Sequence, residues 1–267
     1  MRRDLTSPVP PPVRRGDPAG RPRVRAPVAS HPLSVHREGA GGEVQRRLAI
    51  IVPMKPLSEA KSRLSATLDA PSRAALCLLM LRRVLRATHG HPLIHARYVV
   101  GGDDQVRRLA EEESASWVAD AMGTLNAAVR LGAHTAWDRG ADAVLVLPGD
   151  LALVAPEDVA ALINASWGLR RAAISAAARD GGTNALLTPR GMLVGPHFGP
   201  GSFQRHLAAM RAANVPVEVV DRPGLAFDLD TDVDLERLRA MEPGLEAALE
   251  PWRRMLAKDV ATARRPP

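Results

Sequence analysis

A loop with three cations follows the apolar run 48–52. It holds Lys55, Lys61 and Arg63 among small residues. Ligands of open α/β sheets bind beyond the carboxyl ends of the strands, so a loop in this place is a candidate phosphate site. Its cations could neutralise charge on a transferred phosphorus and on departing pyrophosphate, and nucleotidyl transfer depends mostly on such stabilisation. The alternative is a solvated basic face without a chemical role.

Two acidic segments could hold a metal ion near this loop. Asp150 follows the apolar run 143–147 after a short turn, whereas Asp228 and Asp230 lie two residues apart, on one face of an extended chain. Like charges on one face repel unless a cation lies close to them. Mg²⁺ prefers carboxylate oxygens and can bridge them to phosphates, so we predict these three aspartates as its ligands, with a catalytic role for Asp150. The alternative is that they only open a turn or precede a capped helix.

Two glycine-containing segments could bind a second anion. One consists of Gly181, Gly182 and Thr183, and the other holds Gly199 and Ser202 directly before a predicted helix. Glycines expose backbone N–H groups, and a helix N-terminus favours negative charge. We therefore predict that Thr183, Gly199 and Ser202 bind the phosphate and carboxylate of a small acceptor. The alternative is that the glycines only form turns.

The remaining polar candidates are weaker. Gly123 and Asn126 begin another predicted helix and could contact the ribose or base of a nucleotide, whereas Asp103 is expected only to cap a helix. His197 and His206 flank the second glycine-containing segment. No histidine pair has the spacing of a zinc motif, so neither a metal-bound nor a catalytic histidine is expected.

These segments need a scaffold, and the chain after residue 47 alternates short apolar runs with helical periodicities. This alternation is typical of an α/β fold with a mostly parallel sheet. The runs that predict strands are 48–52, 97–100, 116–118, 143–147, 172–176, 185–188 and 217–220, with 225–229 as a candidate eighth. The predicted helices are 72–88, 105–113, 126–137, 157–166, 203–213 and 232–239.

Both ends of the chain depart from this pattern. Residues 1–46 are rich in arginine and proline, which predicts a disordered extension. The first 47 residues hold ten arginines and four acidic residues, so nearly all of the net charge of +7 lies there, which argues against nucleic acid as a partner of the folded part. We predict a single α/β domain over residues 47–245 and a flexible tail over residues 246–267.

Cys77 is the only cysteine, which excludes an intrachain disulfide and a multi-cysteine metal site. Its apolar neighbours predict a buried, unreactive thiol, and a reducing compartment fits this usage. No apolar stretch reaches the roughly 18 residues of a membrane-spanning helix, and the N-terminus lacks the apolar segment of a signal peptide. We therefore expect a cytoplasmic protein without a membrane partner.

Taken in order, the motifs closely resemble one family. The chain is similar, over about residues 48–238, to the 2-phospho-L-lactate or phosphoenolpyruvate guanylyltransferases of coenzyme F-420 biosynthesis. The resemblance implies a Rossmann-like nucleotidyltransferase domain of the nucleotide-diphospho-sugar transferase type, with GTP and Mg²⁺ as co-substrate and cofactor. The segments that carry it are 53–57, 60–64, 148–151, 182–186, 198–203, 223–225 and 228–231.

The resemblance also implies roles and partners. The acceptor is expected to be phosphoenolpyruvate, 2-phospho-L-lactate or 3-phospho-D-glycerate, and Thr183, Gly199 and Ser202 match the acceptor-binding positions. Asp150 matches the metal-binding segment. A downstream deazaflavin transferase and a second copy of the chain are further expected partners. The nucleotide site is expected to comprise Pro53, Lys55, Lys61, Gly123 and Asn126.

The mechanism we expect needs no general base, because an ionised phosphate oxygen of the acceptor attacks the α-phosphorus of GTP in line. Two alternatives are retained. One is a nucleotidyltransferase that acts on a molybdopterin or sugar phosphate, and the other is a non-catalytic nucleotide-binding protein.

Overall fold

A seven-stranded sheet forms the centre of the computed structural model, which describes residues 45–192 and 195–263. The strand order is β3-β2-β1-β4-β6-β5-β7, and only β6 runs against its neighbours. The mostly parallel sheet predicted from the sequence is therefore confirmed. The strands are β1 (Leu48–Met54), β2 (Ile94–Gly101), β3 (Ser116–Val118), β4 (Ala143–Val146), β5 (Ala172–Ala176), β6 (Thr183–Pro189) and β7 (Val217–Val219).

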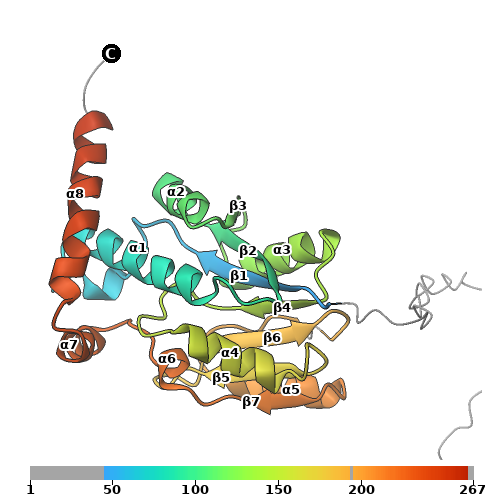
Figure 1. Ribbon diagram of the computed structural model, residues 1–267. Coiled ribbons are helices and arrows are strands. Elements are labelled where there is room, and N and C mark those ends of the chain that lie inside the picture. The colour runs from blue at the N-terminus through green and yellow to red at the C-terminus, as the bar shows by residue number, and fades with distance from the viewer. Residues whose placement is uncertain (1–44, 193–194, 264–267) are drawn as a thin grey trace, which may run out of the picture. The chain divides into compact units, whose positions relative to one another are not determined.

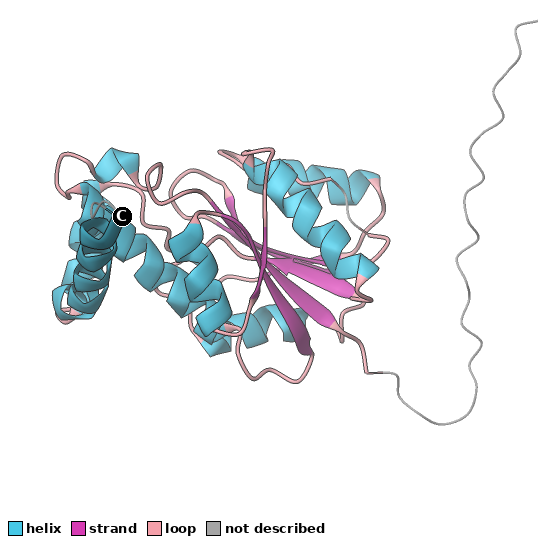
Figure 2. Ribbon diagram, turned by 90° about the horizontal axis from the view of Figure 1, so that it is seen from above, coloured by secondary structure: helices cyan, strands magenta, loops and turns pink. Residues whose placement is uncertain are grey.

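Helices cover both faces of this sheet (Figure 2). All six predicted helices are confirmed, with ends that differ by a few residues at most. Two further helices and a 3-10 turn were not predicted. The helices are α1 (Ala70–Ala87), α2 (Asp104–Glu112), α3 (Leu125–Asp138), α4 (Pro156–Ala165), α5 (Ser202–Ala212), α6 (Pro223–Ala226), α7 (Asp232–Met241) and α8 (Leu245–Ala263), and the 3-10 turn is η1 (Ser62–Leu64).

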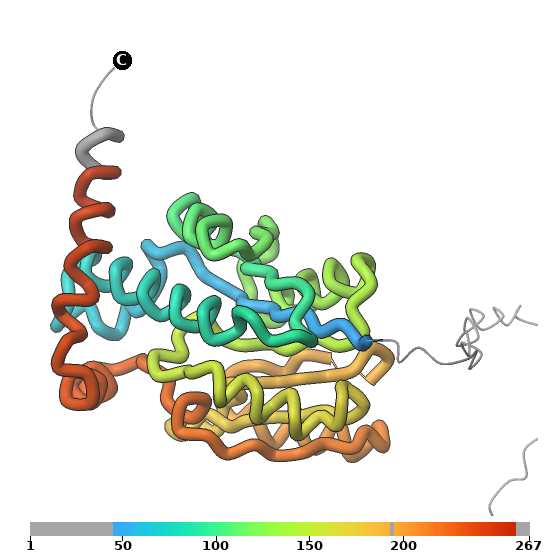
Figure 3. Tube along the Cα trace, in the orientation of Figure 1, coloured from blue at the N-terminus to red at the C-terminus, as the bar shows by residue number. Residues whose placement is uncertain are grey.

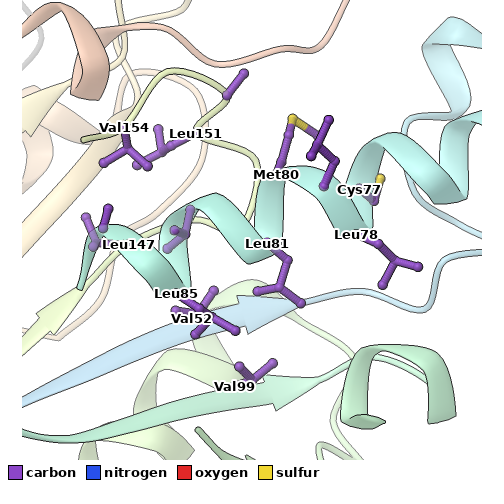
Figure 4. Close-up of a cluster of buried hydrophobic side chains, with 14 of the residues drawn as sticks. Val52, Cys77, Leu78, Met80, Leu81, Leu85, Val99, Leu147, Leu151 and Val154 are labelled. Atoms are coloured by element: carbon purple, nitrogen blue, oxygen red, sulfur yellow. The ribbon is translucent and has the colours of Figure 1, made fainter. Parts of the chain in front are cut away.

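Alternate residues of β1 belong to two separate cores. Leu48, Ile50 and Val52 pack with the apolar side of α1, whereas Ala49 and Ile51 pack with residues of α3 on the opposite face. This period of two follows from the pleat of a strand, and burial on both faces explains why β1 reads as a continuous apolar run. Figure 4 shows the first core, in which Val52 of β1 lies below Leu81 and Leu85 of α1.

The candidate eighth strand, over residues 225–229, is wrong. The chain there forms the short helix α6 instead, and Phe227 follows it in an extended conformation. Pro223 lies at the first helical position, where its fixed φ favours a helical turn and its missing N–H costs nothing. The turn is anchored from the sheet, because the side-chain amide of Asn184 on β6 donates to the carbonyl of Leu225 at 2.9 Å.

The C-terminal residues were expected to form a flexible tail from residue 246, and the structure contradicts this. They form α8, which lies beside α1 (Figures 1 and 3). Its apolar face is buried through Leu245, Leu249, Trp252 and Leu256. The guanidinium of Arg82 on α1 lies 4.1 Å from the ring centroid of Trp252, a cation–π contact. The prediction of a flexible tail was based on the basic side chains of the segment and missed this apolar stripe.

The domain boundary shifts accordingly. The compact unit continues past residue 245 and includes α8. The predicted extension over residues 1–46 lies almost entirely outside the described residues, as do residues 264–267. None of the described helices is long and apolar enough to cross a membrane. A cytoplasmic location remains a prediction from the sequence.

Candidate active site

A cleft of about 560 Å³ opens where β1, β2 and β4 end. Its walls come from the loop after β1, the turn after β2, the start of α3 and the turn after β4. This is the carboxyl edge of the parallel part of the sheet, where the cationic loop was expected to bind phosphate. The predicted site residues that line the cleft are Pro53, Lys55, Lys61, Arg63, Gly123, Asp150 and Asp230.

Lys61 holds two of the aspartates together. Its ammonium donates to Asp150 Oδ2 at 2.7 Å and to Asp230 Oδ1 at 2.9 Å, and only 7% of its side chain is exposed. Burial alone would lower the pKa of Lys61, but the charges of the two aspartates raise the pKa above its ordinary value. Lys61 is therefore a fixed positive charge in the wall of the cleft.

The backbone at Lys61 is strained. It has φ 50° and ψ 39°, the left-handed conformation that residues other than glycine rarely adopt, and it precedes η1. Such a residue costs on the order of 1 kcal/mol and is found where surrounding contacts hold it in place. The two ion pairs supply that restraint. A second restraint comes from Asp103, which accepts from the backbone N–H of Leu57 at 2.8 Å and so ties the same loop to α2.

Asp230 lies at the centre of a group of cations. Besides Lys61, Arg179 donates to its Oδ2 at 2.5 Å, and Arg63 lies 3.6 Å from the same oxygen. Burial opposes a charge on Asp230, but these cations, above all Lys61, hold its pKa below the usual value. Asp230 is consequently ionised at neutral pH.

Asp228 has a different environment, although it lies only two residues away. Within the described part of the chain, Asp228 forms an ion pair with Arg179 alone, at 3.8 Å, and 13% of its side chain is exposed. Burial, together with the negative charges of Asp150 and Asp230, raises the pKa of Asp228 to about 6. A carboxylate that is both buried and short of positive charge favours an additional cation nearby.

The donor set suits a hard cation. Asp150, Asp228 and Asp230 offer carboxylate oxygens, the ligands that Mg²⁺ prefers. In the part of the chain that is described, no group of three or more His, Cys, Asp or Glu side chains is placed to hold a metal ion, so the three aspartates do not form a metal site by themselves. Mg²⁺ commonly binds through one or two carboxylates and completes its shell with water and substrate phosphates. The residues present therefore fit an ion that binds together with a nucleotide.

The predicted acceptor residues form a buried polar cluster beside this centre. Ser202 Oγ donates to Thr183 Oγ1 at 3.0 Å, and Thr183 Oγ1 also lies 2.9 Å from His206 Nδ1. The backbone N–H of His197 donates to His206 Nε2, so the proton of the ring is on Nδ1. Thr183 and Ser202 are 5% and 0% exposed, and neither lines the cleft. Their side chains hold the loop 197–202 against β6, and a direct contact with an acceptor stays a prediction.

The loop between β5 and β6 connects this cluster to the aspartates. Its Asp180 and Gly181 carbonyls accept from Gly201 and Phe203, both at 3.1 Å. On its other side, Ala178 donates to the carbonyl of Ala226, next to the acidic segment. The two glycine-containing segments thus come together as predicted, and they lie beside the carboxylates.

Asn126 differs from its prediction as a nucleotide-binding residue. Its amide group accepts from the backbone N–H of Phe198 at 2.9 Å and donates to the Phe198 carbonyl at 3.3 Å. Asn126 is not part of the cleft lining. The side chain joins α3 to the loop before α5, whereas Gly123, three residues earlier, does line the cleft. The expected cap of α2 is present at Asp103, and Thr124 caps α3.

Several residues of the site were missed. Gly101 ends β2 and Gly102 follows it, both with φ near +85°. A Cβ on Gly101 would lie 2.5 Å from the carbonyl oxygen of Met54, so only glycine allows this approach. Asp120 lines the cleft beside them. All three lie at or just after the carboxyl ends of strands. The expectation that ligands bind there, which identified Asp150, could therefore have identified them as well. Arg179 gave no such signal, because only the fold brings it to Asp230.

Cys77 lies in the floor of the cleft and is buried, as predicted. Burial raises the pKa of its thiol to about 12, so the thiol stays protonated at neutral pH.

Comparison with known proteins agrees with this geometry. The family model described as "Guanylyl transferase CofC like" matches residues 48–262. The chain belongs to this family. It is 46% identical over 191 residues to a phosphoenolpyruvate guanylyltransferase of Rubrobacter xylanophilus, a match that covers 71% of this chain and 92% of the relative. A protein of the same name from Sphaerobacter thermophilus is 36% identical, over 72% of this chain and 93% of the relative.

Solved structures show the same fold at much lower sequence identity. A chain described as a nucleotide-diphospho-sugar transferase from Desulfovibrio desulfuricans G20 superposes with a TM-score of 0.61 at 19% identity and covers 78% of this chain and 98% of its own. A 4-diphosphocytidyl-2C-methyl-D-erythritol synthase gives 0.52 at 15% identity, over 74% and 98%. The nucleotide-diphospho-sugar transferase type of α/β fold is thereby confirmed.

Family membership confirms the resemblance that the sequence motifs indicated. The protein is a nucleotidyltransferase of the guanylyl transferase group. The family model ends within α8, which supports including that helix in the domain. Neither of the two alternatives, a molybdopterin or sugar phosphate acceptor and a non-catalytic nucleotide-binding protein, gains support from these relatives.

Proposed function

We propose that the protein transfers GMP from GTP to the phosphate of phosphoenolpyruvate and releases pyrophosphate, as a step of coenzyme F-420 biosynthesis. The observation that carries the proposal is the convergence of Lys61 on Asp150 and Asp230 at the cleft, in a chain whose relatives are named phosphoenolpyruvate guanylyltransferases. Phosphorylated three-carbon acids such as 2-phospho-L-lactate and 3-phospho-D-glycerate are the related acceptors to compare.

In the proposed reaction an ionised phosphate oxygen of the acceptor forms a bond to the α-phosphorus of GTP. The bond from the α-phosphorus to the oxygen that leads to the β-phosphate breaks, and pyrophosphate leaves with the electron pair. The protein moves no proton, which agrees with a cleft lined by cations and carboxylates rather than by a nucleophile–base pair. Mg²⁺, held by Asp150 with Asp228 or Asp230, would supply charge neutralisation at the phosphate oxygens.

The cationic residues of the cleft have different roles in this proposal. Lys61 and Arg63 stabilise the negative charge of the phosphates, and Lys55, which is exposed in the same loop, draws the triphosphate in. Buried, fixed charges act strongly on a transition state because they need no reorganisation during the reaction. Lys61 fulfils this condition best, since its side chain is nearly buried and both aspartates hold it in place.

We further propose that Asp120 favours guanine. It lines the cleft after β3, and its Oδ1 accepts from the backbone N–H of Met122 at 2.9 Å. Trp117 fixes the neighbouring turn by donating to the Gly101 carbonyl at 2.8 Å. Guanine presents two adjacent donors, N1–H and N2–H₂, and a carboxylate accepts from both, whereas adenine presents an acceptor at N1.

The proposed product is a phosphoric anhydride, in which a diphosphate linkage joins GMP to the phosphate of phosphoenolpyruvate. A reactive product of this kind favours direct delivery to the expected deazaflavin transferase. The association with that enzyme and a homodimer both stay predictions from the sequence.

The test is pyrophosphate release by the purified full chain with GTP, Mg²⁺ and each of the three acceptors, and without acceptor. Release that depends on phosphoenolpyruvate supports the proposal. Release with 2-phospho-L-lactate or 3-phospho-D-glycerate alone would change the acceptor. No release with any of them, despite measurable GTP binding, would contradict the proposal and favour a non-catalytic nucleotide-binding protein.

A further inference from the structure

Arg179 lies at the carboxylate group of the site but outside the cleft. It belongs to the loop between β5 and β6, donates to Asp230 Oδ2 at 2.5 Å, and lies 3.8 Å from Asp228 and 3.9 Å from Asp180. About 31% of its side chain is exposed. It is not among the described residues that line the cleft. Arg179 therefore reaches the aspartates from the β5–β6 loop, whereas Arg63 of the cationic loop lies near the same Asp230 oxygen and lines the cleft.

Asp230 separates two cations. Lys61, which lines the cleft, binds its Oδ1, and Arg179 binds its Oδ2. Lys61 is nearly buried and bonded to a second aspartate, so it is fixed in place. Arg179 is more exposed, on a short loop, and its guanidinium has five N–H donors, of which the carboxylates engage only some. Arg179 thus retains donors for another anion.

The loop that carries Arg179 is hydrogen-bonded to the start of α5. Gly201 and Phe203 donate to the carbonyls of Asp180 and Gly181, so the two segments are bonded side by side. Gly201 is the N-cap residue of α5 and has no side chain, so no side-chain hydrogen bond caps this helix. The positive end of this helix and the guanidinium of Arg179 consequently border the same region, next to the aspartates.

In the proposed reaction, the second anion of the acceptor has to be bound near the carboxylates. In-line transfer places the attacking oxygen and the departing pyrophosphate on opposite sides of the α-phosphorus. We place the triphosphate in the cleft beside Lys61 and the acceptor on the side of the carboxylates where Arg179 lies. An acceptor that is both a phosphate and a carboxylic acid then presents its carboxylate beyond the attacking phosphate, and a planar guanidinium matches a carboxylate with two parallel hydrogen bonds.

We propose that Arg179 binds the carboxylate of the acceptor, and so selects phosphorylated acids over simple phosphate esters. The inference rests on the proposed function and adds to it the residue that recognises the second anionic group. In the absence of acceptor, Asp228 and Asp230 hold the guanidinium near the position where it is needed.

The test uses Arg179→Gln and Arg179→Lys in the full chain. Calorimetry measures the binding of phosphoenolpyruvate in the presence of Mg²⁺ and a GTP analogue with a methylene group between the α- and β-phosphates, and separately the binding of that analogue. We expect Arg179→Gln to weaken acceptor binding by about 10- to 100-fold, the loss of a charge-assisted pair, and to change analogue binding by less than about twofold. Arg179→Lys should retain part of the affinity, since it keeps the positive charge but cannot form the two parallel hydrogen bonds of a guanidinium.

Two arginines provide matched controls. Arg63→Gln removes a cation near the same oxygen of Asp230 but on the cleft side, so it should weaken binding of the analogue rather than of the acceptor. Arg171→Gln removes a surface arginine that pairs with Glu218 at 3.0 Å, and it should change neither.

The outcomes separate the inference from the proposed function. Unchanged acceptor affinity in Arg179→Gln overturns the inference and leaves the proposed function standing if the wild type still releases pyrophosphate. An equal loss of acceptor and analogue binding also overturns it, because Arg179 would then only hold the aspartates in place. If the wild-type protein neither binds phosphoenolpyruvate nor releases pyrophosphate with it, the proposed function fails, and the inference fails with it.

Discussion

The ammonium of Lys61 donates to Asp150 across 2.7 Å and thereby joins the loop after β1 to the turn after β4. These two segments are 89 residues apart in sequence. Each follows a buried parallel strand, and the pairing of β1 with β4 brings their ends to one edge of the sheet. The central charge pair of the site is thus a direct result of strand order.

Replacement of Lys61 tests whether its fixed positive charge contributes to catalysis. Lys61→Met keeps most of the length of the side chain and removes its charge, and we expect kcat to fall by about 10²- to 10³-fold, the range for loss of one preorganised electrostatic group. Lys55→Met, in the exposed part of the same loop, should mainly raise KM for GTP. Steady-state kinetics measure both, and near-wild-type kcat in Lys61→Met would contradict the assigned part.

Asp120→Asn tests base selection. An amide can accept only one of the two hydrogen bonds from guanine and presents donors as well, so the preference for GTP over ATP should fall by at least about tenfold in kcat/KM. The carboxylate also accepts from Met122, so thermal unfolding is measured alongside as the control for a local rearrangement. An unchanged preference would show that another group reads the base.

The sequence predicted the scaffold well because the scaffold depends on local patterns. All seven strands and six helices are marked by apolar periodicity that needs no partner to be read. The misassigned segment around Leu225 and the stable helix α8 depend on tertiary contacts, such as the bond from Asn184 and the packing of Trp252 against α1. These contacts join segments that are distant along the chain.

The residues of the site likewise fall into those that are recognisable from local sequence and those that depend on tertiary contacts. Lys61 and Asp150 follow strands and were identified from that position alone. The position of Asn126 at the start of a helix is equally clear, but its commitment to the Phe198 backbone depends on a loop 72 residues away. Arg179 reaches Asp230 only through the geometry of the β5–β6 loop, and no residue spacing indicates such a contact.

His206 makes stability depend on pH. It is fully buried and hydrogen-bonded as the neutral ring, and burial lowers its pKa to about 4 from 6.5. Between these values the unfolded chain binds a proton that the folded chain does not, so stability rises with pH across this window and is lost as the pH falls through it. The contribution is on the order of 2–3 kcal/mol.

Denaturant unfolding at pH 4.5 and pH 7 measures this effect. In His206→Gln the loss of hydrogen bonds lowers the free energy of unfolding at both pH values. The difference in this free energy between pH 4.5 and pH 7 should nevertheless shrink, by about the contribution derived above for His206. The readout is the difference in the free energy of unfolding between the two pH values, and a destabilisation that is equal at both values does not change it. A full pH difference in the variant would assign the effect to other groups.

Trp252→Ala tests whether α8 is part of the fold. The side chain is 6% exposed and stacks under Arg82, so its removal should lower the free energy of unfolding by about 3–5 kcal/mol. Arg254→Ala, whose side chain is 73% exposed on the same helix, should change it by less than about 0.5 kcal/mol. Equal, small effects of the two substitutions would mean that α8 does not stabilise the domain.

The mass of the reaction product tests the central claim most directly. The wild-type chain is incubated with GTP, Mg²⁺ and phosphoenolpyruvate, and the mixture is analysed at once by mass spectrometry, with Asp150→Asn as the inactive control that retains the wild-type circular dichroism spectrum. We predict a species in which GMP is joined to phosphoenolpyruvate, in amounts equal to the pyrophosphate released, and its absence with Asp150→Asn. Hydrolysis of GTP without such a species, or the same yield from Asp150→Asn, would contradict the account.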